Sequence, residues 1–318
     1  MSTVFTVGLH VVDMLGRPVV DIPAGQNVAM LEEIRICIAG TAAATAVDLA
    51  RLGVPVRTFG CVGNDLLGTV IINQMSREGV DVGGLRVVDD APTSSTILPI
   101  RPNGDRPALH VIGSTARLVL ADVPLEEIAP GDVVHIGGTF LLPGLDGEPT
   151  LELAREAKSR GAIVTMDFIP HERPDLQELL LPVLPYLDYI FPNLEDAGYF
   201  AALDDRREIA AFYLDRGVGC TVLTMGGDGV SVWPRGGEEI LLPAFAVDVV
   251  DTSGCGDSFS AGFISGLLDG LNLESSAQRG LACGSLVATG LGSDAGLVNL
   301  EQVQSLIATG ARAHATWI

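Results

Sequence analysis

One short segment combines small residues with two carboxylates at a spacing that suits phosphate chemistry. It reads Asp251-Thr-Ser-Gly-Cys-Gly-Asp257, follows an apolar run at 244–250 and leads into a helical pattern. Gly254, Cys255 and Gly256 would let the backbone approach a ligand closely, and the N–H groups and dipole of a helix N-terminus favour an anion. Asp257 would repel a resting phosphate, so we expect it to accept the proton of an attacking hydroxyl in phosphoryl transfer.

A purely structural interpretation of this segment competes with the catalytic one. Glycine-rich turns often begin helices, and an aspartate in the first turn complements the helix dipole. Lys158 is the only lysine and lies in an amphipathic helical pattern, so a phosphate-binding loop ending in Gly-Lys-Ser/Thr is impossible. Phosphate chemistry in this chain must therefore rely on backbone amides, arginines and a metal ion.

Composition and charge exclude several classes of protein. The chain has 318 residues, of which 47% are apolar, and a net charge of −21. We expect no nucleic-acid partner, because a phosphate backbone needs a basic footprint, and no membrane span, because no apolar run approaches ~18 residues. Five scattered cysteines without a C-x-x-C pair, and an N-terminus without a secretory pattern, predict a cytoplasmic protein with reduced thiols.

Short β-rich runs alternate with helical patterns over most of the chain. This alternation predicts an α/β fold, a doubly wound and mostly parallel sheet flanked by helices, with residues 1–318 forming one domain. The expected strands are 4–7, 57–61, 133–136, 163–167, 189–191 and 221–224, and the expected helices are 41–52, 66–78, 148–160 and 209–216.

Two excursions, at about 13–38 and 92–112, break this alternation. Both contain short strand-like runs separated by Gly, Pro and Asn, and the second includes Asn103-Gly104, a strong hairpin signal. We expect them to build a small antiparallel β lid over a pocket, a surface for a homodimer, or both.

The string Asp-Thr-x-Gly-x-Gly-Asp-x-Phe-x-x-Gly at 251–262 closely resembles the C-terminal signature of the ribokinase-like (PfkB) carbohydrate kinase family. Residues 40–68 resemble the family's N-terminal signature, and 192–197 and 224–230 resemble its Asn-x-x-Glu segment and nucleotide-side turn. These elements occur in family order over nearly the whole chain. The resemblance implies a ribokinase-like fold and an ATP-dependent kinase that phosphorylates a hydroxyl of a sugar or sugar derivative.

The resemblance also implies roles for the residues around the first segment. Asp257 would be the catalytic base, and Gly254, Cys255 and Gly256 would form the anion hole for the γ-phosphoryl group. Asp251 and the Ser253 carbonyl match positions that in relatives often bind an activating monovalent cation such as K⁺.

The implied cofactors are ATP and Mg²⁺. Asn193 and Asp196 would position Mg²⁺ and the phosphates through water. The residues that would line the ATP groove are Thr224, Gly226 and Gly229. Asp13 and Gly40 would contact the acceptor beneath the lid.

This chain departs from the family pattern mainly on the acceptor side. The usual sugar-binding Asn corresponds to Ala44, which cannot bond a hydroxyl; Thr41 or Thr45 could replace it, although threonines on an apolar helix are more often merely buried. The family's glutamate is Asp196, with Glu195 adjacent.

Two polar residues of the second excursion, Arg106 and His110, are either acceptor contacts or solvated lid residues.

Other functions compete with a sugar kinase. A nucleoside kinase of the same fold needs an aromatic or apolar platform for the base, and the two excursions contain no Phe, Tyr or Trp. A nicotinamide-dependent oxidoreductase needs G-x-G-x-x-G after the first strand, where this chain has Val7-Gly-Leu-His-Val-Val-Asp13. A non-catalytic sugar- or nucleotide-binding protein on the kinase fold would not need a base at Asp257.

Overall fold

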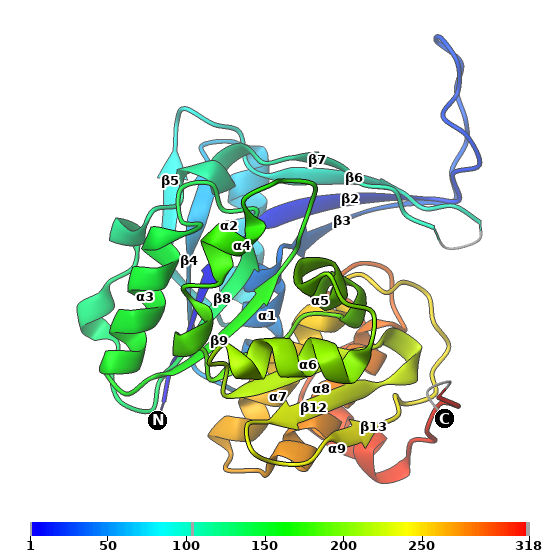
Figure 1. The fold of residues 1–318 in the computed structure, drawn as a ribbon. Helices are drawn as coiled ribbons and strands as arrows, with labels where there is room; N and C mark the ends of the chain where they lie inside the picture. Colours follow the sequence, from blue (N-terminus) through cyan, green and yellow to red (C-terminus); the bar gives the residue numbers. More distant parts are fainter. Residues whose placement is uncertain (1, 103–104, 316–318) are drawn as a thin grey trace.

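A nine-stranded sheet runs through the described part of the chain, which in this computed structural model comprises residues 2–102 and 105–315 (Figure 1). In spatial order its strands are β13 (Ile240–Leu242), β12 (Val230–Pro234), β11 (Cys220–Thr224), β10 (Tyr189–Ile190), β9 (Ile163–Phe168), β8 (Val133–Thr139), β1 (Val4–Gly8), β4 (Val56–Gly63) and β5 (Asp81–Val88). All neighbours from β11 to β5 are parallel, whereas β12 and β13 are added antiparallel.

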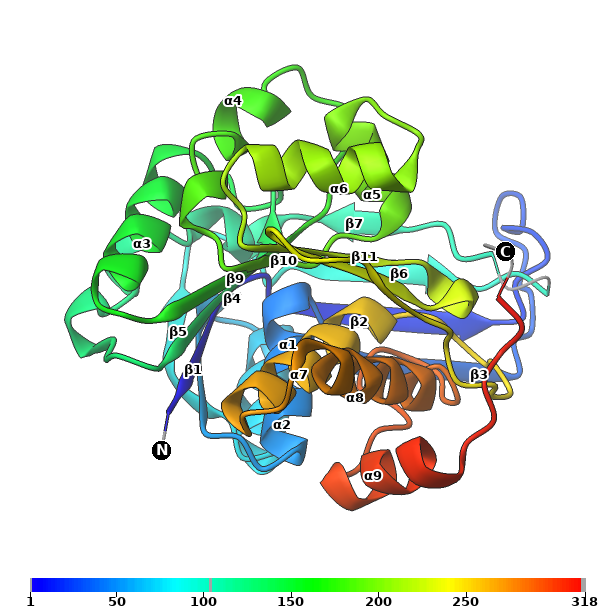
Figure 2. The same ribbon diagram turned by 60° about the horizontal axis from the view of Figure 1, so that its bottom comes forward.

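Helices cover both faces of this sheet (Figure 2). One layer consists of α3 (Glu148–Ser159), α4 (Leu176–Leu180), α5 (Leu194–Ala201) and α6 (Arg206–Asp215). The other consists of α1 (Thr41–Arg51), α2 (Leu66–Arg77), α7 (Cys255–Leu268), α8 (Leu273–Val287) and α9 (Leu300–Thr309). The parallel strands therefore bury side chains on both faces, which explains their near-continuous apolar runs and confirms the predicted α/β class.

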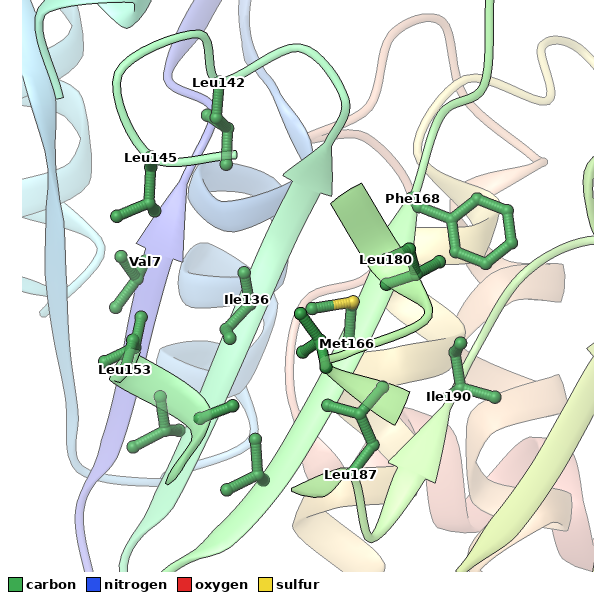
Figure 3. Packing of buried hydrophobic residues seen from close by; sticks show 14 of the residues in the cluster. Val7, Ile136, Leu142, Leu145, Leu153, Met166, Phe168, Leu180, Leu187 and Ile190 are labelled. Atoms are coloured by element: carbon green, nitrogen blue, oxygen red, sulfur yellow. The ribbon is translucent and has the colours of Figure 1, made fainter. Parts of the chain in front are cut away.

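Apolar side chains fill the space between the sheet and the first helix layer (Figure 3). Val7, Ile136 and Met166 extend from three neighbouring strands, and Leu153 of α3 and Leu180 of α4 pack against this cluster. All five are fully buried. This packing fixes the helices relative to the strand ends where polar residues collect.

The predicted elements agree with the observed ones, with small shifts at the ends. The two largest, of three residues each, are at β8, which ends at Thr139 rather than at 136, and at α6, which begins at Arg206 rather than at 209. At α6 a helix cap explains the earlier start. The cause is Asp205, whose carboxylate accepts hydrogen bonds from the N–H groups of Arg207 and Glu208 at 2.9 and 3.0 Å. Within the described residues, no helix has the length and hydropathy needed to cross a membrane.

The two excursions form a second, smaller sheet, as predicted. Its strands are β3 (Glu33–Ala39), β2 (Val11–Arg17), β6 (Ser95–Pro99) and β7 (Leu109–Val111). Each excursion is an antiparallel pair, whereas β2 and β6 are parallel to each other. This parallel pair was not predicted; it arises because β2 and β6 follow β1 and β5, which end at the same edge of the main sheet. Asn103-Gly104 lies outside the described residues.

The small sheet stands over the carboxyl edge of the main sheet, and the loop between β2 and β3 extends away from the body (Figure 1). Ligands of doubly wound folds bind at this edge. The fold thus brings the lid strands, the ends of β8 to β11 and the start of α7 to one place.

Candidate active site

The segment 251–257 is a tight turn that leads into α7. Gly254 is the N-cap of α7 with a φ of 75°, and a Cβ atom there would lie 2.4 Å from the Cβ of Ser293. Glycine is therefore required by both the backbone conformation and the close approach of the neighbouring loop. No side chain caps this helix in the described part of the chain, so the N-terminus of α7 is open to an anion.

Two cavities meet at this turn. The first, which we call the nucleotide cavity, is lined by Asn193, Thr224, Gly226, Gly227, Gly229, Ala244, Phe245, Val247, Val249, Thr252, Cys255, Gly256, Phe259, Gly280, Leu281, Gly284, Ser285 and Ala288. The second, the acceptor cavity, is lined by Leu9, Val11, Asp13, Ala39, Gly40, Thr41, Thr96, Leu98, Arg106, Ala108, His110, Leu141, Ile169, Ser253, Gly254, Asp257 and Ser293. The predicted catalytic residues thus divide between the cavities, with Cys255 and Gly256 on one side and Gly254 and the predicted base Asp257 on the other.

The nucleotide cavity contains the predicted residues Thr224, Gly226 and Gly229. Gly229 has a φ of 107°, and a Cβ atom there would lie 2.0 Å from the carbonyl oxygen of Leu242, so this turn also requires glycine. Sequence reasoning missed the role of 244–249: this apolar run contributes four residues to the cavity wall instead of joining the sheet. Its apolar residues, interrupted only by Asp248, carry no sequence signal that distinguishes a cavity wall from core.

Asn193 and Asp196 lie side by side at the start of α5. The Asn193 side chain accepts a hydrogen bond from the Asp196 N–H at 2.8 Å and donates one to the Asp196 carboxylate at 2.6 Å. Asn193 lines the nucleotide cavity, whereas Asp196 is not among the described residues that line either cavity. Burial raises the pKa of Asp196, although the bond from Asn193 opposes this.

The acceptor cavity contains both predicted acceptor residues. Asp13 is only 9% exposed on β2, and burial raises its pKa to about 6. Gly40 has a φ of 92°, and a Cβ atom there would lie 2.6 Å from the carbonyl oxygen of Leu9, so its presence also has a local structural cause. His110 contacts the hydroxyl of Thr96 through Nδ1 at 3.1 Å.

The structure distinguishes the two threonines near the missing asparagine. Ala44 is buried inside the helix layer at 2% exposure. Thr45 donates a hydrogen bond to the carbonyl oxygen of Asp257 at 3.3 Å and so supports α7. Thr41 lines the acceptor cavity, and its buried hydroxyl has no hydrogen-bond partner among the described residues. Thr41 is therefore the one of the two placed to bond an acceptor.

Asp257 lies among several other carboxylates. Burial raises its pKa well above the ordinary value, and repulsion from Asp167, Asp48 and Asp13 raises it further. Asp167, at the end of β9, accepts a hydrogen bond from the Gly138 N–H at 2.7 Å, and burial raises its pKa as well. Asp48, on α1, accepts a hydrogen bond from Ser258, and burial raises its pKa to about 7.

Sequence reasoning missed Asp167 and Asp48 as members of the site. Asp167 could have been found from its place at the carboxyl end of a central strand. Asp48 lies in a helix 209 positions before the base in the chain, and only the packing of α1 against α7 brings it close. No group of three or more His, Cys, Asp or Glu side chains among the described residues could hold a metal ion directly.

Asp251 and Ser253, the predicted cation-site residues, are adjacent and buried. The Asp251 carboxylate accepts hydrogen bonds from the Ser253 N–H at 3.0 Å and from its hydroxyl at 2.9 Å. Arg106 of the lid also contacts both residues, with Nη1 3.1 Å from Oδ1 of Asp251.

A doubly wound sheet with a smaller sheet over its carboxyl edge, and a helix N-terminus between two cavities, is the architecture of the ribokinase fold. The family model for the pfkB family carbohydrate kinases matches residues 1–299, and the chain belongs to this family. It is an ATP-dependent carbohydrate kinase.

Individual relatives agree with this assignment. The chain is 30% identical over 291 residues to a 2-dehydro-3-deoxygluconokinase of Bacillus subtilis, covering 87% of this chain and 88% of that protein. It is 26% identical over 279 residues to a ribokinase of Haemophilus influenzae, covering 85% and 87%. The solved ribokinase of Arabidopsis thaliana, complexed with ribose and ATP, has the same fold, with a TM-score of 0.82, 20% identity, and coverage of 97% and 99%.

Proposed function

We propose that Asp257 is the base of this kinase and that the turn at 254–256 holds the transferred γ-phosphoryl group. The observation that carries the proposal is the position of this turn between the two cavities. ATP would occupy the nucleotide cavity and the sugar the acceptor cavity, so the phosphoryl group would cross at the start of α7.

The chemistry follows from the positions of these groups. Asp257 accepts the proton of the acceptor hydroxyl as its oxygen attacks the γ-phosphorus, and the bond between that phosphorus and the β–γ bridging oxygen breaks to release ADP. The backbone N–H groups and the dipole of α7 stabilise the charge on the γ-phosphoryl oxygens. Because burial and, secondly, neighbouring carboxylates raise the pKa of Asp257, it is a stronger base than an ordinary aspartate.

Mg²⁺ would bind on the nucleotide side, near Asn193 and Asp196. The two side chains are bonded to each other, which leaves few direct ligands and suits a hydrated ion that keeps most of its waters and binds the phosphates. A divalent cation there would also offset the repulsion between Asp196 and Asp167.

A sugar or sugar derivative fits the acceptor cavity better than a nucleoside does. None of the described residues that line it is Phe, Tyr or Trp, and its apolar lining is aliphatic, as at Leu98 and Leu141, so a base would find no large ring to stack on. Asp13 and Thr41 offer a carboxylate and a free hydroxyl to sugar hydroxyls, which compensates for the alanine at 44.

An ADP-release assay with Mg²⁺·ATP over a panel of sugars, sugar acids and nucleosides tests this function. We expect ADP release that depends on one or more sugars or sugar acids, with little or none from nucleosides. Preferential turnover of a nucleoside would refute the acceptor class, and no release with any acceptor would favour the binding-protein interpretation.

We further propose that the lid pairs with the lid of a second copy. Its outer face exposes Ile34, Ile36 and Ile97 at 72, 52 and 51%, with Leu109 and Val111 beside them on β7. A contiguous apolar patch of this kind is uncommon on the surface of a monomer. Two copies of the same patch can pack against each other across a two-fold axis. Ile34→Glu with Ile97→Glu should convert a dimer to a monomer in light scattering; a wild-type monomer would refute the proposal.

The cytoplasm is the compartment that the cysteines favour. All five are unpaired, and four of them are buried. Free thiols persist in reducing compartments.

A further inference from the structure

Asp251 is a buried carboxylate whose oxygens are already occupied by protein donors. It is 6% exposed. Oδ1 accepts from the N–H and the hydroxyl of Ser253, and Oδ2 accepts from the N–H of Gly292 at 2.8 Å. Hydrogen bonds replace the hydration of a buried carboxylate only in part, and an opposite charge nearby favours its ionised form further.

Arg106 supplies that charge. Its Nη1 lies 3.1 Å from Oδ1 of Asp251 and also donates a hydrogen bond to the Ser253 hydroxyl. Arg106 belongs to the loop between β6 and β7, and it lies 145 positions before Asp251 in the chain. The ion pair therefore connects the lid to the turn proposed to form the anion hole. The side chain of Asp251 in this pair is only 3% exposed.

These residues do not fit the monovalent cation that relatives often bind at Asp251 and Ser253. Such an ion needs several oxygens in place of its hydration shell. Here the carboxylate oxygens face N–H and O–H donors, and a guanidinium lies in hydrogen-bond contact with both residues. A monovalent cation at this position would therefore be repelled by the positive charge of Arg106.

We propose that Arg106 replaces the monovalent cation, so that the lid itself delivers the positive charge that orders the turn. The proposal rests on the function assigned above to the 254–256 turn. Arg106 acts as a positioning residue: it neutralises Asp251, Asp251 holds the Ser253 N–H, and the next residue begins the anion hole. The kinase then works without K⁺, because the Arg106 guanidinium supplies the positive charge beside Asp251.

The activity test is a K⁺ titration at constant ionic strength, with choline as the replacement cation. Wild-type kcat should change less than about twofold, and Arg106→Ala should lose about tenfold or more in kcat without K⁺. K⁺, ammonium or guanidinium should then restore part of the loss, because the emptied position can accept a cation. Wild-type activity that rises severalfold with K⁺ would overturn the proposal, as would an Arg106→Ala loss confined to acceptor KM and unaffected by cations.

Thermal unfolding gives a second measurement that needs no turnover. At constant chloride, replacing choline with K⁺ should leave the wild-type Tm unchanged and raise that of Arg106→Ala, because only the variant binds the ion. A K⁺-dependent Tm in the wild type, or none in the variant, would overturn the proposal. This result stands even if no acceptor releases ADP, so it separates this inference from the proposed function.

Arg101→Ala is the matched control. Arg101 lies in the same loop, but it donates its hydrogen bonds to the carbonyl oxygens of Val19 and Val20 within the lid. Removal of the Arg101 side chain should leave both kcat and Tm independent of the K⁺ concentration. If this variant also acquires a K⁺ response, the effect comes from general loosening of the lid, and the specific role of Arg106 is refuted.

Discussion

The two cavities that meet at 254–257 are built by different means. None of the described residues lining the nucleotide cavity carries a carboxylate, imidazole, ammonium or guanidinium group; glycines, small residues and the apolar run 244–249 form its wall. The acceptor cavity contains Asp13, Arg106, His110 and Asp257. One cavity depends on backbone shape, and the other on ionisable side chains.

The different linings of the two cavities lead us to expect that acceptor specificity and pH dependence arise mainly on the acceptor side. A shared cosubstrate such as ATP can be held by main-chain groups and apolar contacts, which tolerate many side-chain changes. The acceptor side concentrates carboxylates whose pKa values are raised by burial and mutual repulsion. Substitutions in the acceptor cavity should alter kcat and the choice of acceptor. In the nucleotide cavity, only substitutions that add a side chain where the backbone needs the space should affect ATP binding.

The largest effect is expected from Asp257→Asn. Loss of the base should lower kcat by ~10²–10⁴-fold while leaving the Kd for ATP nearly unchanged, because the carboxylate lies in the acceptor cavity. Steady-state kinetics and calorimetric titration with ATP measure the two quantities. A kcat within about tenfold of wild type would remove Asp257 as the base. In the wild type, the acid limb of kcat/KM should lie well above the ordinary aspartate pKa of 3.8, since the base must be ionised.

Two glycine variants test the turn between the cavities, one on the nucleotide side at Gly256 and one on the acceptor side at Gly254. A Cβ atom at Gly256 would meet no protein atom within 4 Å, so Gly256→Ala should keep the wild-type Tm. It should nevertheless lower kcat/KM for ATP by about tenfold or more, because the methyl group enters the space beside the anion hole.

Gly254→Ala, unlike Gly256→Ala, should reduce stability as well as activity. It places a side chain at a φ of 75° and against Ser293, so both Tm and activity should fall. Equal Tm values for the two variants would contradict the structural requirement at Gly254. Unchanged ATP kinetics in Gly256→Ala would contradict the anion hole.

Asp13→Asn should weaken acceptor binding rather than ATP binding. An ionised hydrogen-bond partner contributes ~1.5–3 kcal/mol, so acceptor KM should rise by about tenfold or more with little change in KM for ATP. Since the pKa of Asp13 is raised to about 6, wild-type acceptor affinity should weaken as the pH falls through 6, and the variant should lose this dependence. An equal rise in both KM values would show that the two cavities are not independent.

The smallest effect on activity is expected from Asp48→Asn, which instead tests whether the buried carboxylates around Asp257 reduce stability. Burial raises the pKa of Asp48 from 3.8 to about 7, so the folded state keeps this proton to a higher pH than the unfolded state. Its contribution to the free energy of unfolding therefore falls as the pH rises from about 4 to 7.

Removing the charge should thus stabilise the protein at pH 8 but not at pH 4. At ~1.4 kcal/mol per pKa unit, the gain in the free energy of unfolding at pH 8 is at most roughly 4 kcal/mol. Urea unfolding at both pH values measures this difference. Asp188→Asn, at a half-exposed carboxylate that pairs with Lys158, is the control and should not stabilise at pH 8. A variant no more stable than wild type at pH 8 would contradict the raised pKa of Asp48.

Much of the fold and half of the site followed from local patterns. The alternation of strand and helix patterns predicted the parallel sheet, and the two excursions predicted the lid strands. Residues with a predicted ligand role, such as Thr224 and Gly229, line the expected cavity because turns at strand ends are locally encoded. The wall at 244–249 was not predictable, because an apolar run has the same pattern whether it faces core or ligand.

The residues of the segment 251–257 were enough to predict a tight turn that leads into a helix. Small residues, a left-handed glycine and a helix start depend on adjacent residues, so a candidate anion site and a candidate base at Asp257 could be proposed without coordinates. The charges around that turn depend instead on tertiary packing. Asp48, Asp167 and Arg106 come from distant segments, and their effect depends on burial and separation, which the chain acquires when its layers and lid pack together.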